Sequence, residues 1–259
     1  MKRRHLLEIT DEPWCPALIR GFVIDYLEQV ITVSKVYEPI VEPLLCAVKS
    51  AHAECVIDLC SGGGGPWRQI GPAFAAHCPT VKVVLTDLHQ NTGAQERLRK
   101  LSGGVIQFHS DSVNALRVPP ELTGFRTLFS AFHHFKPEEA RAILRDAVES
   151  RSGIGIFEGT QRQPAALLGM LLVPLVVWIV TPKIRPFRWS RLLWTYLIPV
   201  VPFVALFDGL VSCLRTYTVA ELREFTDEFP ASDYQWEIGE AKVKHSLAPI
   251  TYLTGYPTD

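Results

Sequence analysis

The chain has 259 residues, a length that suits one large domain or a catalytic core with an added subdomain. Its 26 Lys and Arg against 27 Asp and Glu give a formal net charge of -1, so no overall positive field favours nucleic acid. A hydrophobic content of 47% excludes a disordered or collagen-like chain.

The amino-terminal sequence and the cysteines predict an intracellular protein. Residues 1–8 are basic but lack the apolar run that a signal peptide needs. The six cysteines form no CxxC pair and have no metal-ligand spacing, which is typical of reduced thiols. We therefore expect a cytoplasmic location.

Residues 16–51 have the apolar spacing of helices. Pro39 and Pro43 are expected to bend or break this stretch, which gives two helices covering one edge of the following sheet. We assign residues 1–53 to an amino-terminal helical cap.

From residue 54 the sequence alternates between short β-branched runs and helical stretches. Such alternation predicts right-handed βαβ crossovers and an α/β fold with an open, mostly parallel sheet covered by helices on both faces. The capping box at 218–221 predicts a helix that reaches about residue 229. One further helix is expected to start near residue 69, and two others to span 91–101 and 137–149. The seven expected strands are 55–59, 81–87, 104–108, 126–131, 153–158, 233–241 and 249–256.

The first strand leads into a glycine-rich loop at residues 58–67, where an open α/β sheet binds its ligands. Three nucleotide-binding patterns fail to fit. The loop ends in Gly65-Pro66-Trp67 without the Lys-Ser/Thr of a phosphate-binding P-loop, and it has no GxGxxG. No tyrosine has a lysine four residues later, which excludes the short-chain dehydrogenase pattern.

A fourth pattern does fit. Residues 56–64, Val-Ile-Asp-Leu-Cys-Ser-Gly-Gly-Gly, resemble the first motif of the Rossmann-like (class I) S-adenosylmethionine (SAM) dependent methyltransferases, acid-x-Gly-x-Gly-x-Gly. Cys60 stands where the first glycine of that motif usually sits. The resemblance implies a SAM cofactor, held in this loop by Asp58, Cys60, Ser61, Gly62 and Gly64.

Three later segments extend the resemblance. Asp87 ends the second strand, where the family's acid accepts hydrogen bonds from both ribose hydroxyls. Leu88 would lie against the adenine, and the pair Asp111-Ser112 resembles the one that reads the adenine amino group. Residues 129–135, Phe-Ser-Ala-Phe-His-His-Phe, resemble the motif after strand four, which adds Ser130 to the cofactor site. The resemblance covers residues 54–160 and 218–256.

The candidate catalytic residues are His133, His134 and Asp208. Either histidine, or an acid near the pocket, could act as the general base for a phenol, enol or thiol acceptor. The histidines could equally pack under the cofactor, and Asp208 could pair with Arg215, two helical turns away. We expect no metal, because adjacent histidines point apart and no third ligand is apparent nearby.

Residues 160–217 form an insertion after the fifth strand, and 164–214 hold only five of the chain's charged residues. Two uncharged arms, 163–182 and 192–207, flank a basic connector, 183–191. Two features argue against a hairpin that spans the membrane. Prolines interrupt both arms. A spanning hairpin would also place the basic connector on the far side of the membrane, against the positive-inside tendency. We expect a hydrophobic lid that dips into a membrane through 164–214, with a soluble cap or a dimer interface as the alternative.

Together these features predict a SAM-dependent methyltransferase with a core at 54–159 and 218–259. It would transfer a methyl group by in-line displacement to a small or lipid-like hydrophobic acceptor, at the cytoplasmic face of a membrane. Nucleic acid is disfavoured as a partner. The sequence leaves open whether the chain forms a homodimer. The alternative, based on Cys60, is a non-catalytic SAM-binding fold that serves as a membrane-attached or dimerising scaffold.

Overall fold

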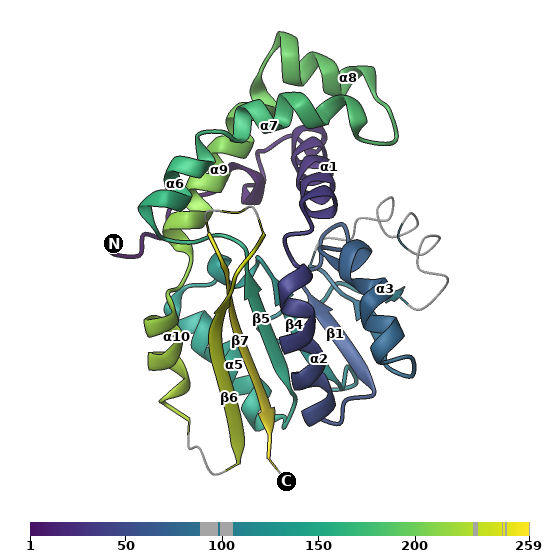
Figure 1. The fold of residues 1–259 in the computed structure, drawn as a ribbon, viewed down its shortest axis with the longest axis vertical. Coiled ribbons are helices and arrows are strands. Elements are labelled where there is room, and N and C mark those ends of the chain that lie inside the picture. The colour runs from purple at the N-terminus through teal and green to yellow at the C-terminus, as the bar shows by residue number, and fades with distance from the viewer. Residues whose placement is uncertain (89–97, 99–105, 230–232, 245, 247, 259) are drawn as a thin grey trace.

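The computed structural model describes residues 1–88, 98, 106–229, 233–244, 246 and 248–258. Its centre is a seven-stranded sheet in the order β3-β2-β1-β4-β5-β7-β6 (Figure 1). The strands are β1 (Cys55–Leu59), β2 (Lys82–Leu85), β3 (Ile106–Phe108), β4 (Phe125–Phe129), β5 (Ile154–Glu158), β6 (Tyr234–Ala241) and β7 (Ile250–Pro257). The predicted Rossmann-like α/β sheet is confirmed.

Strands β1 to β5 pair in parallel, and β7 runs antiparallel to both β5 and β6. The central strands β4 and β5 are buried at every position, because helices cover both faces of the sheet. Their continuous apolar runs could therefore be read as strands, although they show no alternation.

Helices α2 (Val41–Ser50) and α3 (Trp67–His77) cover one face of the sheet, and α5 (Pro137–Glu149) and α10 (Val219–Thr226) cover the other. The predicted capping box of α10 is present, since Thr218 Oγ1 accepts from Glu221 N at 3.3 Å. The predicted helix 91–101 lies, except for Leu98, outside the described residues.

The expected break among the amino-terminal helices is also present. Helix α1 (Ala17–Ser34) ends at Lys35, which adopts the left-handed conformation, and the short η2 (Glu38–Ile40) leads into α2. Only α2 packs on the sheet. Helix α1 instead packs against the insertion, because its apolar face, with Phe22 and Tyr26, shares a core with that segment.

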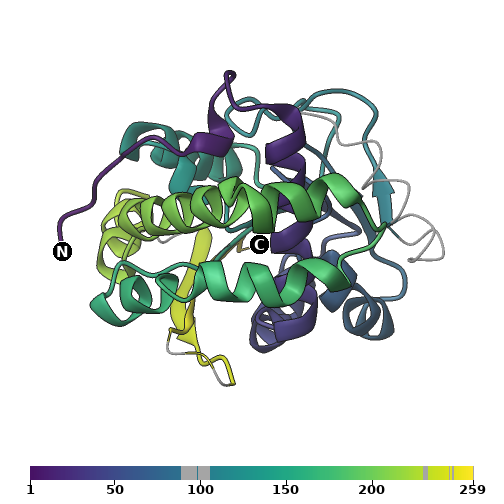
Figure 2. The ribbon, with the colours of Figure 1, turned by 90° about the horizontal axis from the view of Figure 1, so that it is seen from above.

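The insertion is a helical lid beyond the carboxyl ends of the parallel strands, and its helices α7 and α9 lie side by side (Figure 2). Pro174 lies in the first turn of one helix and Pro199 precedes another, so both arms break near these residues. The segments are α6 (Pro164–Met170), α7 (Val173–Val180), η4 (Thr181–Lys183), α8 (Trp189–Leu192), a π-helical turn η5 (Leu193–Leu197) and α9 (Val200–Arg215).

Among the described residues, no single helix has the length and apolar character needed to cross a membrane. Two pairs of consecutive lid helices have the required length and apolar character, but only when the two helices of a pair are taken as one segment. The first pair is bent by 42° and the second by 71°.

A buried ion pair fastens the lid to α1. Arg191 is 2% exposed, and its guanidinium donates to Asp25 Oδ2 and to the carbonyl oxygen of Pro186. Its carbon Cζ lies 5.4 Å from the ring centre of Phe22. These contacts satisfy a charge that would otherwise be costly to bury.

Replacing Arg191 with alanine is expected to lower the free energy of unfolding by about 3 kcal/mol, because the substitution leaves the Asp25 carboxylate partly buried without this partner. Urea denaturation followed by circular dichroism measures the change. Arg188→Ala, at an exposed position of the same connector, is the control and should stay within about 0.5 kcal/mol of wild type. Equal stability of the two variants would show that the pair does not hold the lid.

Candidate active site

The loop after β1 adopts a backbone that favours glycine at four positions. Cys60, Gly62, Gly64 and Gly65 have φ angles of 56°, 54°, 113° and 50°. A Cβ atom on Gly64 would lie 2.5 Å from Leu98 Cδ2, so this glycine also allows close packing. Because Cys60 occupies the left-handed region, the structure explains why glycine suits this position of the motif.

The carboxylate of Asp87 ties this loop to the end of β2. Its Oδ2 accepts from Gly62 N at 2.7 Å, and Ser61 N donates to the carbonyl oxygen of Thr86 at 3.0 Å. The predicted ribose acid and the predicted glycine loop therefore meet at the carboxyl ends of neighbouring parallel strands.

Asp58 lies beneath the loop and is 1% exposed. Burial raises the pKa of its carboxyl group to about 7, and the charge of Asp87 acts in the same direction. The hydrogen bond that Thr127 Oγ1 donates to Asp58 Oδ1, at 2.6 Å, acts in the opposite direction.

This pKa predicts a pH dependence of stability. The native carboxyl group holds its proton up to about pH 7, whereas the unfolded one loses it near 3.8, so folding is favoured less as pH rises between these values. The loss is about 1.4 kcal/mol for each pH unit in that window. Urea denaturation of the ligand-free protein should show that Asp58→Asn removes this contribution. Asp227→Asn, at an exposed position, should retain it, and equal slopes for all three proteins would contradict the prediction.

The remaining predicted cofactor residues lie at the ends of β3 and β4. Ser112 Oγ donates to the carbonyl oxygen of Leu88 at 2.7 Å, while Asp111 is exposed near His109. Ser130 Oγ lies 2.6 Å from the hydroxyl of Tyr37 and accepts from Gly159 N at 3.0 Å.

An open cavity of about 490 Å³ joins this site to the amino-terminal segment. Three predicted cofactor residues and the predicted base His134 line it together with residues that the sequence did not single out. The lining is Thr10, Asp11, Pro13, Arg20, Cys60, Leu88, Ser130, Ala131, His134 and Phe135.

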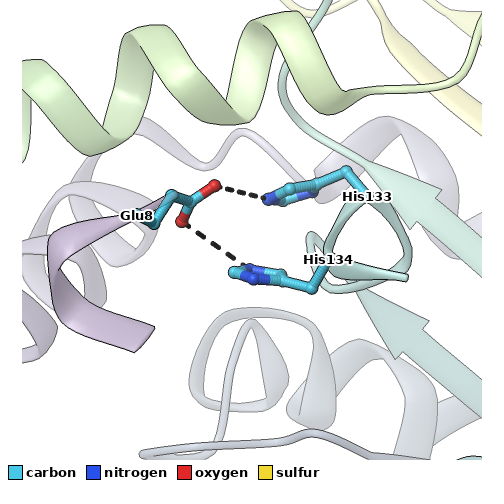
Figure 3. Close-up of side chains that lie close together, drawn as sticks. All are labelled: Glu8, His133 and His134. Carbon is cyan, nitrogen blue, oxygen red and sulfur yellow. Dashed lines mark ion pairs between the residues drawn. The ribbon is translucent and has the colours of Figure 1, made fainter. Parts of the chain in front are cut away.

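His133 and His134 lie in η3 (Phe132–His134), and their ring centres are 4.3 Å apart. The expectation that adjacent histidines point apart is wrong here, because both rings turn toward Glu8 (Figure 3). Nε2 of His133 is 3.7 Å from Glu8 Oε1, and Nε2 of His134 is 3.9 Å from Glu8 Oε2. Glu8 therefore supplies the third side chain that the sequence did not reveal.

Carboxylates hold the opposite ring nitrogens. Nδ1 of His133 is 2.7 Å from Glu158 Oε2, and Nδ1 of His134 is 3.0 Å from Asp11 Oδ2. Burial raises the pKa of Glu8 to about 7. Burial acts in the same direction on Asp11, but its hydrogen bonds and charge interactions with His134 and Arg215 outweigh burial and lower its pKa to about 2.

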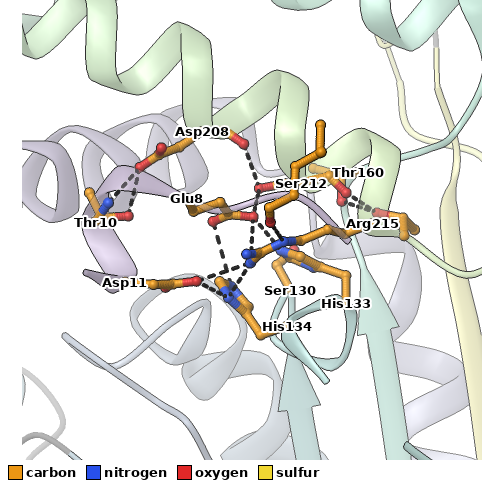
Figure 4. A network of polar contacts seen from close by, with 12 residues as sticks. Glu8, Thr10, Asp11, Ser130, His133, His134, Thr160, Asp208, Ser212 and Arg215 are labelled. Atoms are coloured by element: carbon orange, nitrogen blue, oxygen red, sulfur yellow. Dashed lines mark hydrogen bonds and ion pairs between the residues drawn. The ribbon is translucent and has the colours of Figure 1, made fainter. Parts of the chain in front are cut away.

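Asp208 fastens the amino-terminal segment to α9 (Figure 4). It accepts from Ile9 N at 2.7 Å, from Thr10 N at 3.0 Å and from Thr10 Oγ1 at 2.7 Å. These bonds occupy both carboxylate oxygens, so we correct its assignment from catalytic base to positioning residue. Asp208 also forms no ion pair with Arg215 in this described network, where the guanidinium lies 3.2 Å from Glu8 Oε1 and 3.0 Å from Asp11 Oδ2.

No family model matches the chain, and no curated protein matches its sequence. Several solved structures share its fold. A proposed O-methyltransferase from Nostoc punctiforme has a TM-score of 0.52 and 16% identity, over 98% of this chain and 64% of its own. Human N-acetylserotonin methyltransferase, solved with SAM, has a TM-score of 0.52 and 11% identity, over 96% of this chain and 61% of its own.

The methyltransferase domain of a bacterial Hen1 protein has a TM-score of 0.51 and 12% identity, over 85% of this chain and 99% of its own. The chain thus spans less than two thirds of the Nostoc and human proteins and nearly all of the Hen1 domain. At these identities the likeness concerns the fold.

Proposed function

Because the chain has the Rossmann-like fold of the class I SAM-dependent methyltransferases, we propose that it transfers a methyl group from SAM to a small or lipid-like hydrophobic acceptor. One observation carries this proposal: a single cavity is lined by Cys60, Leu88 and Ser130 on the cofactor side and by His134 on the other. A methyl donor and its acceptor need such a shared space.

In this proposal SAM lies across the carboxyl ends of β1 and β2. A Cβ atom on Gly62 would meet nothing within 4 Å, so the loop has room there for the amino-acid end of SAM. Asp87 accepts hydrogen bonds from the ribose hydroxyls while it keeps its bond to Gly62 N. Leu88, which is half exposed, offers an apolar surface to the adenine.

The reaction is an in-line displacement. A bond forms from the acceptor atom to the methyl carbon, and the carbon–sulfur bond breaks, so that the sulfonium becomes a neutral thioether. The protein holds the two reactants in contact and excludes bulk water. An acceptor with an O–H, N–H or S–H group also sheds a proton, which we assign to the cluster of His133, His134 and Glu8.

The surface of the lid supports a hydrophobic acceptor. Fourteen of the 23 exposed large apolar side chains among the described residues lie between 168 and 207. Soluble monomers rarely present so dense an apolar surface without a partner for it. These residues are Leu168, Leu171, Leu172, Leu175, Trp178, Ile179, Phe187, Trp189, Leu193, Tyr196, Leu197, Ile198, Phe203 and Phe207.

The partner that this surface fits best is the interface of an anionic membrane. Lys183, Arg185 and Arg188 are exposed in the connector, whereas the fourth basic residue, Arg191, is buried in its ion pair. Exposed cations beside Trp189 suit the boundary between head groups and acyl chains. The lid would then lie in the cytoplasmic leaflet and open the cavity to a membrane-dissolved acceptor.

Turnover tests the proposal. The full chain is incubated with SAM carrying a radiolabelled methyl group and with bacterial membrane lipids, and the organic extract is counted. We expect label in a lipid-soluble product. At SAM concentrations well below saturation, Asp87→Asn should lower this activity at least about 10-fold. Glu149→Gln, at an exposed position of α5, should keep it.

The same experiment separates the enzyme from the scaffold alternative. A scaffold would bind SAM and membranes but leave the organic extract without label above the level of a protein-free incubation. That result, obtained with both lipid and aqueous cell extracts as sources of acceptor, would contradict methyl transfer.

A further inference from the structure

Glu8, His133 and His134 bring three ligand atoms together at the edge of the cavity. One nitrogen or oxygen atom from each residue lies within 4.8 Å of the other two. The histidines come from η3, and Glu8 precedes η1 (Ile9–Asp11), so the site forms only when the amino-terminal segment lies across the core. His134 lines the cavity, which leaves the cluster open on one side.

The ring nitrogens of both histidines are arranged as a histidine–metal site requires. Glu158 and Asp11 can accept a hydrogen bond from Nδ1 of His133 and His134, respectively, and Arg215 Nη1 also lies 3.3 Å from Nδ1 of His134. With the ring proton on Nδ1, each histidine would present Nε2 as a ligand. The lone pairs then lie on the two Nε2 atoms, which face Glu8. A carboxylate behind each histidine is the usual outer arrangement of histidine–metal sites.

A second observation also points to a ligand. His133 is 2% exposed, and its Nε2 has no hydrogen-bond partner within the described part of the chain. A buried nitrogen with an unused lone pair costs free energy unless something binds it. The nearest acid oxygen, Glu8 Oε1, lies 3.7 Å from this nitrogen, which is beyond hydrogen-bond distance.

The other contacts of Glu8 leave one oxygen available. Its Oε1 accepts from Ser212 Oγ at 3.0 Å and lies 3.2 Å from Arg215 Nη1, whereas Oε2 faces His134. Arg215 also lies 3.0 Å from Asp11 Oδ2. The single positive charge of Arg215 is outnumbered by the three carboxylates of Glu8, Asp11 and Glu158. The cluster can therefore still accept a cation.

We propose that Nε2 of His133, Nε2 of His134 and the carboxylate of Glu8 bind one divalent transition-metal ion of the zinc type. Two imidazoles and one carboxylate, with an open fourth position, form a known donor set for catalytic zinc. Metal–ligand distances of about 2.0–2.2 Å need only a slight approach of these side chains. If the proposed function holds, an acceptor hydroxyl would take the open position, ionise more easily and lose its proton to solvent in the open cavity, because the metal would then occupy the lone pairs of the cluster.

The test uses the full chain after removal of metals with a chelator. Zn²⁺ is titrated against a chromophoric chelator that competes for it, and Co²⁺ is added to a second sample as a spectroscopic probe. We expect one equivalent of Zn²⁺ to bind and the visible Co²⁺ bands of a four-coordinate site to appear. Glu8→Gln and His134→Gln should each weaken Zn²⁺ binding at least 100-fold, while His77→Gln, an exposed histidine of α3, should match wild type.

Binding of SAM is measured on the same samples, which separates this inference from the proposed function. If SAM binds but Zn²⁺ does not, the metal site is overturned and methyl transfer is untouched. Zn²⁺ binding that keeps wild-type affinity in Glu8→Gln and His134→Gln also overturns the site, whether or not His77→Gln changes it. Circular dichroism checks that the variants fold, and the Co²⁺ spectrum of the wild-type chain decides the matter if they do not.

Discussion

Replacing Asp87 with asparagine is expected to weaken SAM binding between about 10-fold and 100-fold. The amide oxygen can still accept from Gly62 N, so the glycine loop should keep its shape. The substitution removes the charge and one acceptor, so the ribose hydroxyls lose a charge-assisted hydrogen bond. Such a bond contributes about 1.5–3 kcal/mol, which sets the size of the effect.

Equilibrium dialysis with labelled SAM measures this change, and thermal unfolding checks that the variant is folded. Glu149→Gln removes an exposed acid far from the loop and should bind SAM as the wild type does. An Asp87→Asn affinity within twofold of wild type would mean that this carboxylate does not contact the sugar.

Replacing Trp189, Leu197 and Phe203 together with serine is expected to lower the affinity of the chain for anionic vesicles at least 100-fold. These side chains are 78%, 76% and 60% exposed, so they belong to no core and their loss should leave the fold intact. Each apolar side chain of this size contributes about 1.5–3 kcal/mol when it leaves water. Losing part of this free energy at each of the three positions is enough for the expected 100-fold loss of vesicle affinity.

Flotation with vesicles of phosphatidylcholine and phosphatidylglycerol measures this affinity at low salt. Val33→Ser is the matched control, because Val33 is 66% exposed but lies on α1 outside the lid. Wild-type protein that stays with the soluble fraction would contradict the membrane proposal. Sedimentation equilibrium then shows whether the triple variant breaks a dimer, in which case the lid surface is a contact between two copies of the chain.

The sheet and its cofactor loop could be predicted from the sequence because their signals are local. The first five strands are short apolar runs that alternate with helical stretches, and the crossover rule gives the handedness of their connections. The glycine loop was equally visible. Cys60, the one departure from the motif, has a left-handed φ, so the residue differs there but the backbone keeps the conformation that glycine favours.

The part of the site that Glu8 and Asp11 form could not be predicted, because it depends on contacts between residues far apart in the sequence. Glu8 and Asp11 precede the first helix, yet they meet Arg215 and His134 in the folded protein. Asp208 was misassigned for the same reason, since nothing local shows that it accepts the N–H groups of residues 9 and 10. Residues separated by more than 100 positions carry no shared local pattern.

The lid was predictable in composition but not in arrangement. The uncharged arms and their prolines indicated broken helices, and both breaks are present. The sequence did not show that α1 would complete the core of the lid, or that Arg191 would be buried while the other basic residues of the connector stay exposed. Each depends on which face of a helix meets its neighbour.

Calorimetric titration of the purified full chain with SAM tests the central claim most directly. We expect one site per chain, with a dissociation constant in the micromolar range, and binding of the demethylated product at the same site. The absence of any heat of binding up to millimolar SAM, in protein that circular dichroism shows to be folded, would contradict it.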